Sequence, residues 1–193
     1  MSESETGLRA RLVEVGVDLV TREGAQALTL REIARRAGVS HGAPRRYFPT
    51  HLELLSAIAR RGFAELAERA TAVTGDGTAS ARTQLAELSR CYLEFGLGNR
   101  GMYELMFRHD LLESGHLGLR DTSLPLFGRL VDLVGRARPD MDARLVAGAL
   151  WANLHGLVQL WSWGSLQLAS GEAEFTPLLR ATLVAHLGPE AAV

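Results

Sequence analysis

Apolar residues recur at helical spacing along most of this chain. Leu8, Leu12, Val15 and Leu19 follow one another at intervals of four, three and four residues. Such intervals place the four side chains on one face of an α-helix, which has about 3.6 residues per turn. The pattern therefore predicts a first amphipathic helix over about residues 8–23, with a glycine directly after it.

Two short helices joined by a tight turn are predicted next. The run T-L-R-E that begins at Thr29 has the form of a capping box and opens the first of them, which ends at Gly38. Ser40 is expected to cap the other, a helix of about eight residues in which Pro44 lies at the edge of the first turn. Together with the preceding amphipathic helix, these elements predict a helix-turn-helix within a three-helix unit.

The rest of the chain continues in helices. A second capping box, T-H-L-E from Thr50, predicts a long helix to about residue 71, and the polar stretch 74–80 is expected to be a loop. Five further helices are predicted, near residues 81–97, 100–113, 122–137, 140–168 and 175–187. No segment shows the sustained alternation of a β-strand. The expected fold is therefore all-α, with about nine helices.

Charge is balanced overall but uneven along the chain. The 21 basic residues, all arginine, nearly cancel the 22 acidic ones, so net charge gives no evidence about nucleic acid. Between Arg31 and Arg61, however, seven arginines stand against Glu32 and Glu53. A local excess of this kind suits a surface that faces DNA phosphates.

Composition also bears on location. The single cysteine, Cys91, excludes an intrachain disulfide, and the polar N-terminus lacks the apolar core of a signal peptide. Residues 145–171 carry no charged side chain and are long enough to span a bilayer, but seven polar residues interrupt them. We therefore expect a cytoplasmic protein that does not enter the membrane, with this stretch forming a buried helix.

The run from Leu28 to Phe48, L-T-L-R-E-I-A-R-R-A-G-V-S-H-G-A-P-R-R-Y-F, resembles the DNA-binding signature of the TetR/AcrR family of transcriptional regulators. The resemblance extends over about residues 8–66. It implies a recognition helix that enters the major groove of a palindromic double-stranded operator. The positions it assigns to DNA binding are Thr29, Ser40, His41, Gly42, Ala43, Arg45, Arg46 and Tyr47.

Different contacts are predicted within this set. His41 and Arg46 are expected to contact base edges, because both can donate to guanine acceptors. Gly42 allows close approach to DNA, and Arg45 replaces a tyrosine that usually contacts phosphate in the family, so it can hold a phosphate or reach a base. The predicted phosphate contacts are Thr29, Ser40, Arg45 and Tyr47. Four other arginines, Arg35, Arg36, Arg60 and Arg61, are expected on solvated helix faces.

The C-terminal part carries a second resemblance. The stretches 92–107 and W-A-N-L-H-G-L at 151–157 resemble a TetR C-terminal subclass named for its Trp-His-Gly residues, here Trp151, His155 and Gly156. The usual proline of the first stretch is replaced by an arginine.

Small residues suggest how the chain dimerises. Gly148, Ala152 and Gly156 form a helix face that lets another helix approach closely, and we predict that it lies in a dimer interface. The resemblance implies a homodimer built as a four-helix bundle from the predicted helices 140–168 and 175–187 of each subunit.

Soft and aromatic side chains suit a pocket for an apolar effector, although plain core packing is the alternative for each of them. The candidate pocket residues are Phe95, Met102, Tyr103, Met106, Phe107, Trp151 and His155. His155 is either a polar anchor for the ligand or a buried histidine satisfied by a backbone carbonyl.

These observations predict a DNA-binding regulator. The expected parts are a helix-turn-helix domain over residues 1–50, a linking helix over 51–71, and a ligand-binding and dimerisation domain over 72–193. A repressor released by a small, largely apolar effector is favoured, and a ligand-independent repressor or an activator stays open. No nucleophile elbow, P-loop or dinucleotide fingerprint appears, so we expect neither catalysis nor a cofactor or metal.

Overall fold

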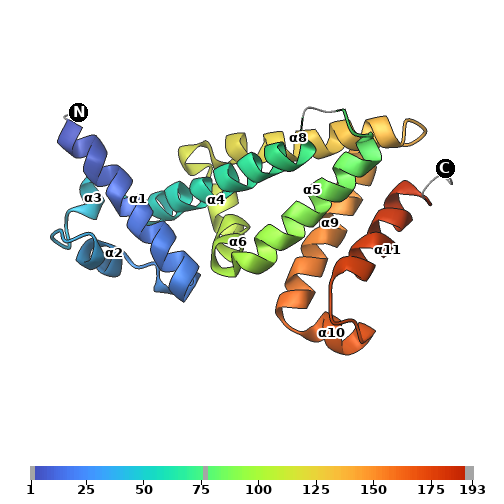
Figure 1. Ribbon diagram of the computed structural model, residues 1–193. Coiled ribbons are helices and arrows are strands. Elements are labelled where there is room, and N and C mark those ends of the chain that lie inside the picture. Colours follow the sequence, from blue (N-terminus) through green and yellow to red (C-terminus); the bar gives the residue numbers. More distant parts are fainter. Residues whose placement is uncertain (1–2, 76–77, 190–193) are drawn as a thin grey trace. The chain divides into compact units, whose positions relative to one another are not determined.

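The computed structural model describes residues 3–75 and 78–189, and within these ranges the chain forms eleven α-helices, two short 3-10 helices and no strand (Figure 1). The all-α expectation is confirmed. The count exceeds the expected nine because two predicted helices are each broken in two.

Both breaks have a local cause. Predicted helix 100–113 is α6 (Arg100–Met106) and α7 (His109–Ser114), because Arg108 adopts an extended conformation and its guanidinium pairs with Asp110 at 2.6 Å. Predicted helix 140–168 is α9 (Ala143–Ser162) and α10 (Ser165–Ser170), separated at Gly164, which has a left-handed φ of 75°. Helical periodicity on either side of a break is the same, which is why the apolar pattern did not reveal it.

The helix-turn-helix forms with one correction. Thr29 caps α2 (Leu30–Arg36) by accepting a 3.1 Å hydrogen bond from the backbone N–H of Glu32, as predicted. The expected cap at Ser40 is wrong, because α3 spans only Pro44–Tyr47. Proline at the first helical position needs no N–H partner and has a suitable φ, so the helix begins there. The backbone carbonyl of Ser40 instead accepts a 3.0 Å hydrogen bond from the N–H of Ala43, in the turn before α3.

The chain divides into two compact units. The first unit comprises Met1–Glu65 and Asn99–Ser123, and the second comprises Leu66–Gly98 and Leu124–Val193. Helices α4 (His51–Thr74) and α8 (Leu119–Ala137) each contribute residues to both. Compactness therefore assigns 99–123 to the same unit as the helix-turn-helix, whereas the expected functional boundary after residue 71 stays a prediction.

Close backbone packing explains why α6 belongs to the first unit. A Cβ at Gly101 would clash with the carbonyl oxygen of Val20 and would lie 3.0 Å from the Cα of Gly24, at the end of α1 (Glu3–Glu23). The short 3-10 helix Ala25–Ala27 follows there. Only glycine lets the two backbones approach so closely.

The core of the first unit is apolar and fully buried. Leu12 and Leu19 of α1 share it with Ile33 of α2, Phe48 after α3 and Ile58 of α4, each with no exposed surface. The three-helix unit and the first turns of α4 are thereby held together by the hydrophobic effect. Thr50 contributes the predicted cap of α4 by accepting from the N–H of Glu53 at 3.2 Å.

The second unit is built from long helices. Figure 1 shows α5 (Ala81–Gly98), α9 and α11 (Thr176–Leu187) packed side by side. Arg82 of α5 donates to the carbonyls of Leu187 and Gly188 at 2.9 and 2.5 Å, which satisfies acceptors left open at the end of α11.

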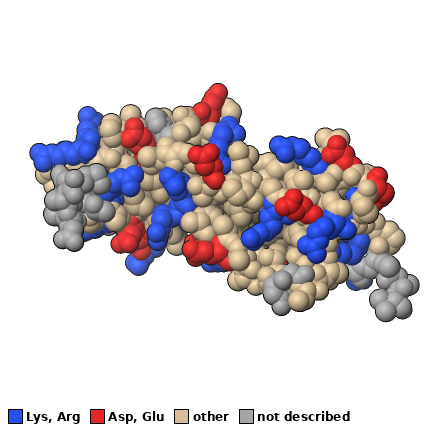
Figure 2. Space-filling model, turned by 90° about the horizontal axis from the view of Figure 1, so that it is seen from above, with Lys and Arg blue, Asp and Glu red and all other residues tan. Residues whose placement is uncertain are grey.

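The surface and hydropathy of the described residues add two facts. Basic and acidic side chains are intermixed on the face drawn in Figure 2, in keeping with the near-zero net charge. No helix in the described part of the chain is long and apolar enough to cross a membrane.

Candidate DNA-binding surface and effector site

The predicted recognition segment is anchored by two buried residues and otherwise accessible. Pro44 and Phe48 are buried and fix the short α3 to the core of the first unit. The predicted contact residues lie between and before them. Ser40, His41, Gly42, Arg45 and Arg46 are exposed, as is Thr29 at the start of α2, whereas Ala43 and Tyr47 are half-buried. The structure thus gathers all eight predicted positions in α2, α3 and the turn between them.

Gly42 has no packing role within the chain. No heavy atom lies within 4 Å of where a Cβ would stand, and its φ is outside the left-handed region. Gly38, by contrast, adopts a left-handed φ of 66° that the turn requires. A side chain at position 42 would therefore affect only what approaches the segment from outside.

Arg35 and Arg36 are occupied by ion pairs, as expected for a solvated helix face. Arg35 contacts Glu32 at 2.6 Å, and Arg36 contacts Glu32 at 2.7 Å and also pairs with Glu23. Hydrogen bonds from Arg35, and to a lesser extent from Arg36, lower the pKa of Glu32 to about 2.

Arg45 and Arg46 differ from that pair. Within the described residues, neither has a carboxylate within ion-pair distance. Their positive charges are therefore not neutralised by any residue that the structure describes.

The candidate effector residues are divided between the two units. Met102, Tyr103, Met106 and Phe107 belong to the first, and Phe95, Trp151 and His155 belong to the second.

In the first unit, the candidates pack against α4. A Cβ at Gly62 would lie 2.5 Å from the Sδ of Met106 and 2.7 Å from the Cγ of Met102. Phe107 stacks edge-on against Phe63, with ring centroids 5.6 Å apart. Both methionines are buried, so these side chains contribute to the core of this unit.

A polar cluster in the second unit contains a residue that the sequence did not reveal. The indole Nε1 of Trp151 donates to the hydroxyl of Tyr92 at 3.0 Å, and that hydroxyl lies 3.1 Å from Nδ1 of His155. Burial lowers the pKa of His155, which favours the neutral imidazole. When the neutral imidazole accepts a hydrogen bond from the Tyr92 hydroxyl at Nδ1, its own proton is on Nε2.

Spacing predicted that Trp151 and His155 share one helix face, but nothing in it indicated Tyr92. That tyrosine lies 63 residues before His155. Its position inside the 92–107 motif was the only available signal. The remaining candidate, Phe95, is fully buried beneath the guanidinium of Arg69, which lies 5.5 Å from the ring centroid.

The predicted interface residues lie on a partly open apolar face of α9. No heavy atom lies within 4 Å of a Cβ placed at Gly148 or Gly156, and Ala152 is exposed. Large apolar side chains border them: the exposed fraction is 72% for Leu145 and 62% for Trp163. Within the described residues, this face is left without cover.

Comparison with known proteins decides the family. A model of tetracyclin repressor-like C-terminal domains matches residues 85–183, and a model of bacterial regulatory proteins of the tetR family matches residues 12–58. The first match alone spans just over half of the 193 residues. The chain belongs to the TetR family. Members of this family are DNA-binding transcriptional regulators rather than enzymes, and they bind operators as dimers. The Trp-His-Gly subclass stays a prediction.

Solved structures agree with this assignment. A protein of unknown function from Rhodococcus sp. RHA1 is 26% identical, with a TM-score of 0.79 over 93% of both chains. A TetR-family transcriptional regulator from Streptomyces coelicolor is also 26% identical, with a TM-score of 0.67 over 97% of this chain and 99% of the other. AibR, solved with isovaleryl coenzyme A and operator DNA, is 13% identical, with a TM-score of 0.68 over 94% and 99%. No curated protein matches the chain.

Proposed function

We propose that this TetR-family protein is a repressor that binds a palindromic operator as a homodimer and is released by a small, largely apolar effector. The observation that carries the DNA half is the recognition segment, in which Pro44 and Phe48 are buried and the exposed side chains of His41, Arg45 and Arg46 form no ion pair with any described residue. Arg45 and Arg46 are the arginines of that segment whose charge the described chain does not neutralise.

Each predicted DNA contact has a physical basis. His41 and Arg46 are assigned to base edges, because both carry N–H donors that suit guanine O6 and N7. Open space around Gly42 is consistent with close approach of a base pair. The backbone contacts are assigned to Thr29, Ser40, Arg45 and Tyr47, whose side chains can donate hydrogen bonds to phosphate oxygens.

The apolar face of α9 supports dimerisation. A row of small residues at Gly148, Ala152 and Gly156 lets a second helix approach, and exposed Leu145 and Trp163 would lose contact with water in the same step. Val184 of α11 is a further exposed apolar side chain. A bundle of α9 and α11 from two subunits provides the two recognition segments that a palindrome needs.

The effector half rests on the aromatic and polar residues of the C-terminal helices. The hydroxyl of Tyr92 and the imidazole of His155 are polar groups next to the indole of Trp151, a combination found in sites that bind largely apolar ligands through a few hydrogen bonds. AibR, with the same fold, was solved with a small molecule and operator DNA.

Coupling between effector and DNA is proposed to use α6 as well as α4. In the first unit, α6 packs against the end of α1 at Gly101 and against α4 at Gly62. A shift of Met102 or Met106 would therefore reach both helices that support the recognition segment. Release requires that the effector bind the DNA-free conformation more tightly than the DNA-bound one.

Selection from a pool of randomised duplexes tests this function. Full-length protein is expected to enrich an inverted repeat, and a panel of apolar compounds is then screened for those that raise the melting temperature of the protein. At least one such compound is expected to dissociate the selected duplex. Stabilising compounds that leave duplex affinity unchanged would support a ligand-independent repressor, and compounds that strengthen binding would support an activator.

A further inference from the structure

Arginines of the first unit fall into groups with different partners. Some pair with carboxylates, namely Arg22, Arg35, Arg36, Arg100 and Arg108. Two donate to backbone carbonyls, namely Arg60 and Arg120. Within the described residues, the following have no ion-pair partner: Arg9, Arg11, Arg31, Arg45, Arg46 and Arg61. The third group contains both arginines of the recognition segment, so its other members are candidates for the same ligand.

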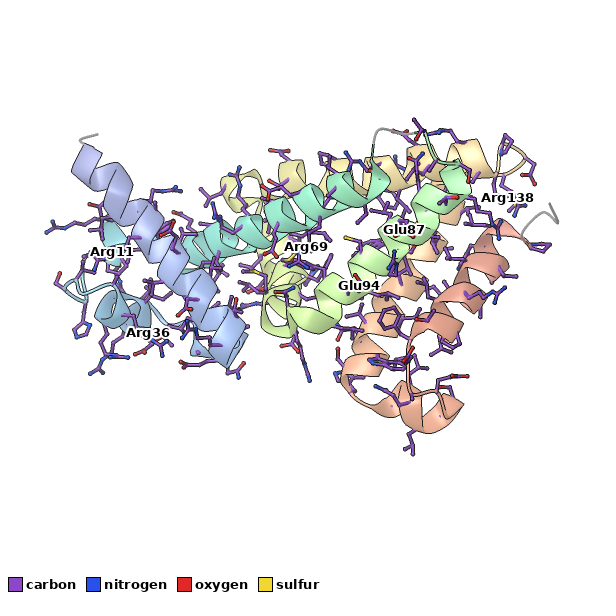
Figure 3. All side chains as sticks on the ribbon, viewed as in Figure 1. Arg11, Arg36, Arg69, Glu87, Glu94 and Arg138 are labelled. Atoms are coloured by element: carbon purple, nitrogen blue, oxygen red, sulfur yellow. The ribbon has the colours of Figure 1, made fainter. Side chains whose placement is uncertain are left out.

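Arg11 is the member of α1 that reaches the helix-turn-helix without an evident structural purpose. It is exposed, and its Nη2 would lie 3.4 Å from a Cβ at Gly38. Figure 3 shows Arg11 on the side of α1 where α2 and α3 lie. Because Gly38 forms the turn that leads to Ser40, the guanidinium is held beside the start of the recognition segment.

Neighbouring arginines of α1 show what a structural role looks like. Arg9 lies over the ring of Phe48, 4.9 Å from its centroid, and so supports the end of α3. Arg22 pairs with Asp18 at 2.7 Å. Arg11 has Glu14 one turn away, yet no ion pair joins the two in the described structure. The fold therefore places a charge at the turn and gives it no acidic partner.

We propose that Arg11 contacts a DNA phosphate next to the recognition segment, which extends the DNA-contacting surface from α2 and α3 onto α1. This inference rests on the proposed function. A guanidinium can hold a phosphate through two parallel hydrogen bonds, and such a contact adds affinity without reading sequence. Arg11 then acts on specific and non-specific DNA alike, unlike Arg46.

Salt dependence of DNA binding distinguishes this role from a packing role. Each phosphate contact releases condensed counterions and adds about 0.9 to the slope of log K against log salt concentration. The probe is a fluorescently labelled random-sequence duplex of about two helical turns, titrated with full-length protein by anisotropy at several salt concentrations. Arg11→Gln is compared with Arg22→Gln, the same change at an ion-paired arginine of the same helix.

Arg11→Gln is expected to lower the magnitude of the slope by about 1 per subunit that contacts the duplex, whereas Arg22→Gln keeps the wild-type slope. Arg11→Lys, which retains the charge, is expected to restore most of it. Equal slopes for wild type, Arg11→Gln and Arg22→Gln would overturn the role of Arg11 while leaving the proposed function intact. Wild-type protein that binds no duplex at any salt concentration would overturn both. Circular dichroism and thermal melting confirm that each variant is folded, and Arg11→Ala, which also removes the charge, replaces Arg11→Gln if that variant does not fold.

Discussion

The helix-turn-helix and the second compact unit differ in how far apart in the sequence their contacting residues lie. In the first, Thr29 caps α2 through Glu32, and Ser40 and Ala43 close their turn, each pair three residues apart. In the second, Tyr92 meets His155 across 63 positions, and Arg82 meets Leu187 across 105. Local contacts set the turns of the recognition segment, and buried Pro44 and Phe48 anchor it to the core of the first unit. The cluster around Tyr92 depends on how α5 and α9 pack against each other, so any change in that packing alters it.

The largest expected effect breaks the contact that ties α6 to α1. Gly101→Ala places a Cβ against the carbonyl oxygen of Val20 and the Cα of Gly24, and backbone cannot move aside as a side chain can. We expect a loss of about 2–3 kcal/mol in the free energy of unfolding. Urea unfolding followed by circular dichroism measures it.

Gly128→Ala is the matched control for that change. It lies within α8, and a Cβ there meets no heavy atom within 4 Å. The higher helix propensity of alanine should raise the free energy of unfolding by about 0.5–1 kcal/mol. Equal changes in the free energy of unfolding for Gly101→Ala and Gly128→Ala would contradict the close packing of α6 on α1.

The next effect concerns sequence reading by α3. Arg46→Ala should weaken binding to the selected duplex by about 10- to 100-fold and to a random duplex much less, because a base-edge contact is lost. Anisotropy titrations with both duplexes at one salt concentration measure the ratio. Equal losses on the two duplexes would make Arg46 a phosphate contact instead.

A smaller effect on the free energy of unfolding distinguishes the predicted cap that the structure contains from the one that it lacks. Thr29→Ala removes the acceptor for the N–H of Glu32 and should lower the free energy of unfolding by about 1 kcal/mol. Ser40→Ala, at the cap that the sequence predicted, should change it by less than about 0.5 kcal/mol, because Ser40 caps no helix in the structure. Comparable losses would restore Ser40 as a cap.

The smallest effect is a pH dependence in the second unit. Burial lowers the pKa of His155 below its ordinary value of 6.5, so the unfolded chain binds a proton more readily than the folded one. Stability from this group is full above pH 6.5 and falls as the pH drops below it. His155→Gln should flatten the fall in melting temperature between about pH 7.5 and 5.5. His41→Gln, at an exposed histidine without an ion pair among the described residues, should not; identical curves for the two variants would contradict the role of burial.

The sequence separation between contacting residues also decides how much of the structure the sequence could predict. Thr29 and Thr50 were identified as caps because the partner of each is three residues away. The predicted cap at Ser40 is wrong because serine and proline both favour the start of a helix. Only the packing of Pro44 into the core decides between the two positions. Breaks at Arg108 and Gly164 were missed because apolar periodicity runs through them.

Sequence separation also decides which residues of the candidate sites could be predicted. All eight positions predicted to bind DNA lie between Thr29 and Tyr47, and the resemblance could place them by their order alone. The effector candidates come from three helices, and their distribution over two units depends on which helices pack together. Tyr92 could not be found from the spacing of α9, because the hydrogen bond that includes it joins two helices far apart in sequence.

A hydroxyl-radical footprint of wild-type protein on the selected duplex tests the central proposal most directly. A dimer that presents two copies of the exposed segment around Arg46 should protect two symmetric stretches on both strands, with centres about one helical turn or a multiple of it apart. Arg46→Ala should lose both together. A single protected stretch without an inverted copy, or protection that survives the substitution unchanged, would contradict a dimeric regulator that reads its operator through α3.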